Sequence, residues 1–91
     1  MGMIAARHAR EVVANAETVV ALEALGAAQA LDLRAPLEPA AGTAAARAAI
    51  RERFPHLDAD REMTRDLESA AELLRSGALV AAAEGAAGPL A

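Results

Sequence analysis

The stretch MIAARHAREVVANAETVVALEALGAAQAL, residues 3–31, decides the fold. It contains no proline and a single glycine, Gly26, and its larger apolar side chains recur mostly three and four residues apart. This spacing is typical of one face of a helix, and the intervening alanines favour helical geometry. We therefore predict one long helix over residues 3–31. Its predicted apolar face consists of Ile4, His8, Val12, Ala16, Val19, Val20, Leu22, Leu25 and Leu31.

Such a helix is long for a chain of 91 residues. At 1.5 Å per residue it extends about 43 Å, whereas a compact globule of this chain length has a diameter of about 30 Å. Alanine accounts for 28 of the residues, which leaves few large side chains for a core. We therefore expect the helix to project beyond its own domain and to pack against another protein surface.

Proline residues divide the rest of the chain into shorter helices. Pro36 and Pro39 end the first helix, because proline lacks an amide hydrogen and disfavours helical geometry in the residue before it. Thr43 is expected to cap a second helix over residues 44–54, which Pro55 terminates. The predicted buried side of this helix carries Ala46, Ile50 and Phe54.

Two further helices are expected in the last third of the chain. Asp60 or Thr64 is predicted to cap a third helix that ends near Ser76, and Gly77 suits the left-handed conformation after a helix end. Its predicted buried stripe consists of Met63, Leu67, Ala70, Ala71 and Leu74. A short fourth helix is expected over residues 78–84. The predicted fold is all-α, with residues 1–84 forming one helical segment and residues 85–91 a flexible tail.

The composition excludes several classes of function. There is no cysteine, which excludes disulfide bonds, thiolate zinc sites and cysteine nucleophiles. The net charge is −4 and Phe54 is the single aromatic side chain among Phe, Tyr and Trp, a combination that argues against nucleic-acid binding. No apolar run is long enough to span a bilayer, so we expect no membrane partner. Since nothing in the composition requires an oxidising compartment, we expect a cytoplasmic location.

One acidic segment matches a calcium-binding loop only in part. From Asp58 to Ser69, oxygen-bearing side chains occupy the first, third, fifth, seventh and ninth positions. A calcium loop also requires glycine at the sixth position and a glutamate at the twelfth, where this chain has Met63 and Ser69. We prefer the alternative that these acidic side chains gather at the start of a helix, whose positive end attracts them.

Other candidate side chains lack the partners that their chemistry requires. The two histidines are far apart in sequence, whereas a metal ion needs three or four convergent ligands. Neither serine has a histidine and a carboxylate at a recognisable spacing. Two arginines of the first helix are expected on a solvated face rather than at an anionic ligand. The two histidines are His8 and His56, the two serines are Ser69 and Ser76, and the two arginines are Arg7 and Arg10. We assign no catalytic, cofactor-binding or metal-binding residue.

The order of residues carries a further signal. Residues 19–37, VVALEALGAAQALDLRAPL, place Gln29, Asp32 and Arg34 at the end of the long helix. Asp60-Arg61, Asp66-Leu67-Glu68 and the run RSGAL at residues 75–79 follow in that order. These landmarks resemble the C-terminal region of the aromatic amino-acid ammonia-lyases, a family that includes histidine ammonia-lyase and related aminomutases. The resemblance covers residues 1–80.

The resemblance implies a fragment of a much longer, mostly helical homotetrameric enzyme that eliminates ammonia from an aromatic amino acid. The family's electrophile is a methylidene-imidazolone group formed from an internal Ala-Ser-Gly, and the family uses a tyrosine in proton transfer. This chain contains neither Ala-Ser-Gly nor tyrosine. The family's catalytic-region glutamate lies in a Gln-Glu-Asp-His-Val-Ser-Met-Gly motif, of which Met1-Gly2 matches only the last two residues. No catalytic residue of the family is therefore carried over.

We expect the chain to be the C-terminal helical segment of such a lyase, inactive alone. Met1 is then an internal methionine taken as a start, or the chain comes from a split or truncated gene. Its expected partners are the remainder of the parent enzyme and its other subunits. Histidine, converted to urocanate and ammonia, is the first choice of substrate, although GMIAAR at residues 2–7 also resembles the tyrosine and phenylalanine branches. The alternative is a free-standing small helical module whose apolar face binds a partner.

Overall fold

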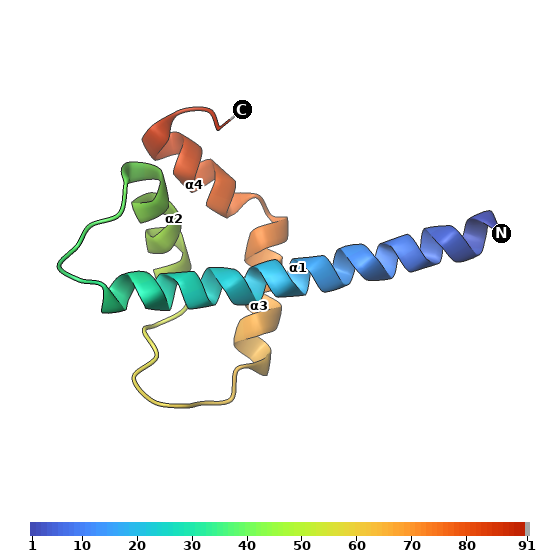
Figure 1. Cartoon of the computed structure of the whole chain (residues 1–91), viewed down its shortest axis with the longest axis horizontal. Helices are drawn as coiled ribbons and strands as arrows, with labels where there is room; N and C mark the ends of the chain where they lie inside the picture. Colours follow the sequence, from blue (N-terminus) through green and yellow to red (C-terminus); the bar gives the residue numbers. More distant parts are fainter. Residues whose placement is uncertain (91) are drawn as a thin grey trace.

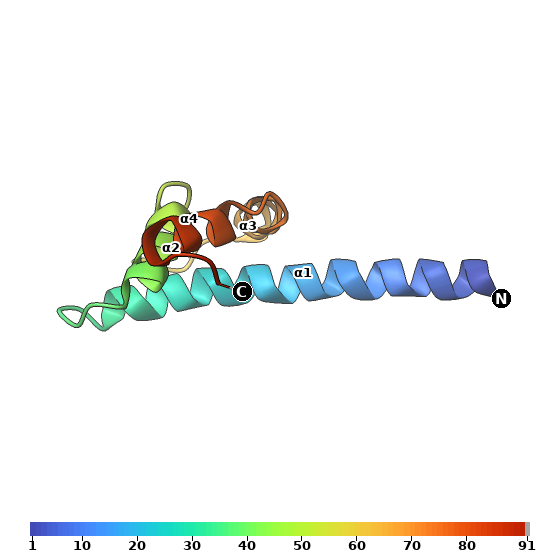
Figure 2. The same cartoon turned by 90° about the horizontal axis from the view of Figure 1, so that it is seen from above.

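The computed structural model describes residues 1–90, which form four helices and no strand. The helices are α1 (Gly2–Leu33), α2 (Ala41–Arg51), α3 (Thr64–Arg75) and α4 (Ala78–Ala87). Figure 1 shows α1 crossing the whole molecule, with the three shorter helices gathered along its C-terminal half. Seen from above, all three lie on the same side of α1 and leave its opposite side uncovered (Figure 2). The predicted all-α fold with a long first helix is confirmed.

The N-terminal half of α1 projects away from the packed part of the molecule (Figure 1). Every residue from Met1 to Ala16 is exposed. The radius of gyration is 15.3 Å and the principal extents are 54 × 36 × 17 Å, whereas a compact chain of this length has a radius of gyration of about 12 Å. The long helix therefore overhangs its own domain, as its length predicts.

The core is small, and α1 contributes alanine to it rather than large side chains. Ala21 is 0% exposed and Ala28 is 1% exposed, because α3 and α2 pack over this face of the helix. Small side chains allow helix backbones to approach closely. The buried residues are Ala21, Ala28, Ile50, Phe54, Ala70, Ala71 and Leu73, with Ala24, Leu25, Leu67, Ala78 and Leu79 packed against them.

The predicted apolar face of α1 does not form the core of this chain, and its packing against another protein surface stays a prediction. Its larger side chains stay in contact with solvent: Ile4 is 72% exposed, Val12 53% and Leu22 59%. Only Leu25 and Leu31 of the predicted face are partly buried. The spacing correctly indicated a helix, but the helix turns its alanine stripe, and not its bulkier stripe, toward the rest of this chain.

Helix α2 begins and ends three residues earlier than predicted. It starts at Ala41 after Ala40, so Thr43 lies inside the helix and does not cap it. It ends at Arg51, and Phe54 lies in the following turn, where its amide still donates to the Ile50 carbonyl at 2.9 Å. Ile50 and Phe54 are buried as predicted, whereas Ala46 is only partly buried.

Helices α3 and α4 follow the predicted order with different caps and limits. Met63 precedes α3, so neither Asp60 nor Thr64 is the cap, and Leu73 is buried where Leu74 was expected. Gly77 has a φ of 79° and separates α3 from α4, as predicted. Helix α4 continues to Ala87, three residues past the predicted limit. The flexible tail stays a prediction, and its last residue lies outside the described part of the chain.

Candidate functional site

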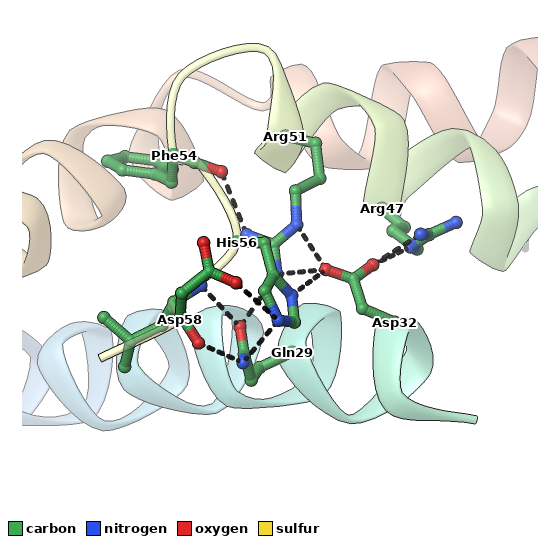
Figure 3. Close-up of polar contacts among 8 residues, drawn as sticks. Gln29, Asp32, Arg47, Arg51, Phe54, His56 and Asp58 are labelled. Atoms are coloured by element: carbon green, nitrogen blue, oxygen red, sulfur yellow. Dashed lines mark hydrogen bonds and ion pairs between the residues drawn. The ribbon is translucent and has the colours of Figure 1, made fainter. Parts of the chain in front are cut away.

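A polar site lies where the C-terminal end of α1 meets α2 and the loop after it (Figure 3). Gln29 and Asp32 are three residues apart on α1, so their side chains share one face of the helix. Arg47 and Arg51 are four residues apart on α2 and point at this face, and His56 reaches it from the loop. We call these five residues the Asp32 cluster.

Both carboxylate oxygens of Asp32 are occupied by donors. Arg47 donates to Oδ1 through Nε at 2.6 Å, and its Nη2 pairs with the same oxygen. Arg51 approaches Oδ2 with Nε at 2.9 Å and Nη2 at 2.8 Å, and His56 Nδ1 donates to the same oxygen at 2.8 Å. The Asp32 side chain is 11% exposed. Hydrogen bonds between charged groups are the stronger kind, so this carboxylate is firmly held.

These donors keep the pKa of Asp32 well below its usual range. The hydrogen bond from His56 contributes most, the one from Arg47 comes next, and Arg51 adds a hydrogen bond and its positive charge. Partial burial acts in the opposite direction but is outweighed. A carboxylate with a strongly lowered pKa is a weak base. The cluster is therefore suited to holding elements together and not to taking a proton from a substrate.

Gln29 connects the cluster to the backbone of the loop. Its Oε1 accepts from the Leu57 amide at 3.0 Å and from Arg51 Nη2 at 3.3 Å. Its Nε2 donates to the Leu57 carbonyl at 2.9 Å and lies 3.3 Å from His56 Nε2. Because a carboxylate only accepts, His56 carries its hydrogen on Nδ1, and Nε2 is left to accept from Gln29. Both the oxygen and the nitrogen of the Gln29 side-chain amide therefore have hydrogen-bond partners in the cluster and the loop.

An apolar hollow of about 280 Å³ adjoins the cluster on the loop side. Its two arginines are already engaged, since Arg51 pairs with Asp32 and Arg61 pairs with Asp66 at 3.0 Å. Its free surface is therefore mainly hydrocarbon, which suits an apolar side chain more than a charged ligand. The hollow is lined by Leu22, Leu25, Gly26, Gln29, Arg51, Phe54, Pro55, Leu57, Arg61 and Met63.

The structure separates the histidines and serines considered from the sequence. His8 is exposed on the projecting half of α1, whereas His56 is a loop residue, as predicted, whose ring belongs to the Asp32 cluster. Ser76 donates to the Leu73 carbonyl at 2.6 Å and accepts from the Ala78 amide at 3.2 Å. Ser76 therefore belongs to a helix end, as its position before glycine predicts.

The arginines of the first helix are placed as predicted. Arg7 and Arg10 are exposed on α1, beside a shallow hollow that Met3 and Ala6 also line.

The acidic segment from Asp58 to Ser69 forms hydrogen bonds and an ion pair among its own residues. Glu62 accepts from the Thr64 amide at 2.9 Å and from the Thr64 hydroxyl, which lowers the pKa of Glu62. Asp66 lies in the first turn of α3 and pairs with Arg61, as the helix-start interpretation predicts. Within residues 1–90, no group of three or more histidine, aspartate or glutamate side chains is placed to hold a metal ion. No helix in the same residues is long and apolar enough to cross a membrane.

Sequence reasoning missed the Asp32 cluster, although the signal was present. Gln29 and Asp32 were noted only as landmarks of a family resemblance, and Arg47 and Arg51 were not singled out. A carboxylate at a helix end, followed by two arginines one turn apart on the next helix, is a pattern of opposite charges on facing surfaces. Arg34, the third landmark, is exposed.

Comparison with known proteins places the sequence of this chain in a family. The sequence profile of the aromatic amino acid lyases matches residues 1–52. A histidine ammonia-lyase from Sorangium cellulosum is 52% identical over 90 residues, which is 99% of this chain and 18% of that enzyme. One from Anaeromyxobacter dehalogenans is 57% identical over 79 residues, covering 87% of this chain and 16% of that enzyme.

A tyrosine ammonia-lyase from Cupriavidus metallidurans is 47% identical over 87 residues, which is 94% of this chain and 16% of that enzyme. No solved structure matches. The chain belongs to the aromatic amino acid lyase family. It spans less than a fifth of the length of these curated relatives.

Proposed function

We propose that this chain is the C-terminal helical segment of a histidine ammonia-lyase-like enzyme and serves its packing and subunit assembly. The observation that carries the proposal is the 52% identity to a histidine ammonia-lyase over 99% of this chain but 18% of that enzyme. The proposed parent reaction converts L-histidine to urocanate and ammonia in the cytoplasm. L-Tyrosine is the alternative substrate, which the 47% identity to a tyrosine ammonia-lyase supports.

The chemistry of the side chains supports a segment without activity of its own. Expelling an amine requires an electrophile, and removing a weakly acidic proton requires a positioned base. Ser69 follows Glu68 and Ser76 follows Arg75, so neither serine belongs to an Ala-Ser-Gly that forms a methylidene-imidazolone group. Asp32 is held ionised by its three donors, Arg47, Arg51 and His56. In this proposal both groups come from other parts of the parent enzyme.

The surface of α1 supports the assembly role. Large apolar side chains such as Val12, Val19 and Leu22 are exposed on α1, and neighbouring exposed apolar side chains are typical of a surface that contacts another protein. In the proposed homotetramer, the remainder of the parent and its other subunits cover these side chains. The Asp32 cluster holds α2 and the following loop on α1, so the segment presents a fixed surface to those partners.

Complementation tests the proposal. The chain is produced alone and together with the Sorangium cellulosum enzyme lacking the region that aligns with it, and ammonia release is measured with L-histidine and L-tyrosine. We expect no activity from either part alone and histidine deamination from the pair. A chain carrying Ala21→Leu, which overfills the contact with α3, is the control and should restore less. Deamination by the chain alone contradicts the proposal, and a well-folded chain that restores nothing favours the free-standing module.

A further inference from the structure

The ring of His56 has a charged partner on one side and an uncharged partner on the other. Its Nδ1 donates to Asp32 Oδ2 at 2.8 Å, and its Nε2 lies 3.3 Å from Nε2 of Gln29. The carboxylate of Asp58 lies just beyond, with Oδ1 3.8 Å from the same ring nitrogen (Figure 3). The His56 side chain is 36% exposed, so protons from the solvent reach it. Histidine is the side chain that ordinarily changes charge between pH 5 and 8.

The hydrogen bond between Gln29 and His56 requires a neutral ring. With its hydrogen on Nδ1 and bound to Asp32, the neutral ring uses Nε2 to accept from the Gln29 amide. Protonation places a second hydrogen on Nε2 and turns this acceptor into a donor. The new N–H then faces the NH2 group of Gln29, and two donors form no hydrogen bond. The contact with Gln29 is therefore lost when the ring becomes charged.

Gln29 cannot restore the contact by turning its amide over. Its Oε1 accepts from the Leu57 amide at 3.0 Å and from Arg51 Nη2 at 3.3 Å. Its Nε2 donates to the Leu57 carbonyl at 2.9 Å. A reversed amide sets its NH2 group against two donors and its oxygen against a carbonyl oxygen, so three hydrogen bonds are lost and one is gained. Gln29 therefore stays in place, and the ring has to change its partner.

The charges around His56 select the new partner. They come from three elements: Asp32 from α1, Arg47 and Arg51 from α2, and Asp58 from the loop between α2 and α3. The two arginines already outnumber Asp32, so a charged ring adds to an excess of positive charge. Asp58 supplies the missing negative charge, and its side chain is 91% exposed and has room to turn toward the ring. A hydrogen bond between two charged groups is stronger than one between neutral groups.

We propose that His56 is a protonation switch. The neutral ring is bound by Gln29, whereas the charged ring releases Gln29 and binds Asp58, with Nδ1 held on Asp32 in both states. Capture of Asp58 ties the exposed residues 58–62 to the Asp32 cluster. This loop also supplies side chains to the wall of the apolar hollow, so the switch acts on that wall. The switch belongs to this chain alone and does not depend on the proposed lyase role.

Nuclear magnetic resonance of the full chain between pH 8 and pH 5 tests the exchange of partners. Spectra that correlate ring hydrogens and nitrogens should show His56 with a hydrogen on Nδ1 at pH 8 and on both nitrogens at pH 5. The side-chain NH2 resonances of Gln29 should shift with the same midpoint. His8, which is exposed on the projecting half of α1, is the internal reference for an isolated histidine. A neutral His56 with its hydrogen on Nε2, or Gln29 resonances that do not follow His56, overturns the proposal.

The capture of Asp58 is measured separately, by nitrogen relaxation of the backbone. As the pH falls from 8 to 5, the order parameter of the Asp58 amide should rise toward about 0.85, the value of rigid backbone. Asp58→Ala removes the acceptor and should at least halve this rise at the neighbouring Ala59 amide. Asp60→Ala is the matched control, because it removes another exposed carboxylate of the same loop, and it should leave the rise intact. Equal effects of the two variants, or no rise in the unaltered chain, overturn the proposal.

Discussion

Replacing Ala21 by leucine should destabilise the fold, although leucine and alanine both favour helices. Ala21 is 0% exposed within the cluster that joins α1 to α3, and Arg75 of α3 pairs with Glu17 one turn away at 2.9 Å. The added carbons have no space unless the two helices separate. Overfilling of this kind typically costs about 1–3 kcal/mol of unfolding free energy.

Thermal unfolding followed by circular dichroism measures this effect. In a domain of this size, each kcal/mol lost lowers the Tm by about 4–8 °C. Ala27→Leu is the matched control, because Ala27 is exposed on the same helix. We expect it to change the unfolding free energy by less than about 0.5 kcal/mol. If Ala21→Leu is as stable as the unaltered chain, the alanine-lined contact with α3 is refuted.

Acid should destabilise the fold through Asp32. Folding lowers the pKa of Asp32, so the ionised carboxylate contributes its full stabilisation above pH 3.8, the usual aspartate pKa. This stabilisation is lost progressively as the pH falls below 3.8. As the pH is lowered through this range, the urea midpoint of Asp32→Asn should fall less steeply than that of the unaltered chain. Parallel pH dependences of the two midpoints would argue against the Asp32 cluster. Gln29→Ala should release the loop, seen as faster hydrogen exchange at the Leu57 amide, whose acceptor it removes; unchanged protection would contradict this role. Gly77→Ala should cost about 1–2 kcal/mol because φ is 79°. Gly85→Ala, within α4 and with open space around the added Cβ, should instead stabilise by about 0.5–1 kcal/mol. Thermal melts in which Gly77→Ala and Gly85→Ala shift the Tm in the same direction would contradict this pair of predictions.

The sequence predicted the helices well because their causes are local. Apolar spacing, proline positions and Gly77 act within a few residues, so the order and approximate limits of all four helices followed from them. The choice of buried face did not follow. Hydrophobicity favours burial of Leu22 and Val19, but the geometry of the α1–α3 contact selects Ala21 and Ala28, and the larger residues remain outside.

The Asp32 cluster was harder to predict because it depends on how two helices are placed. Asp32 and Arg47 are separated by a loop with two prolines, and nothing local shows that the chain reverses so as to bring α2 onto the end of α1. His56 gave still less signal, since it reaches Asp32 from a loop without regular geometry. The resemblance to a family identified Gln29 and Asp32 as landmarks but said nothing of what they bind.

The projecting half of α1 makes the molecule a lever. Its sixteen exposed residues span about 24 Å beyond the point where α3 holds the helix. Since an unbroken helix is stiff, a small tilt at that fulcrum becomes a much larger displacement at Met1. Substitutions in the contact between Ala21 and α3 therefore change the position of the N-terminal end of α1 as well as the stability of the fold. A partner bound to that end would be displaced by repacking that takes place far from it.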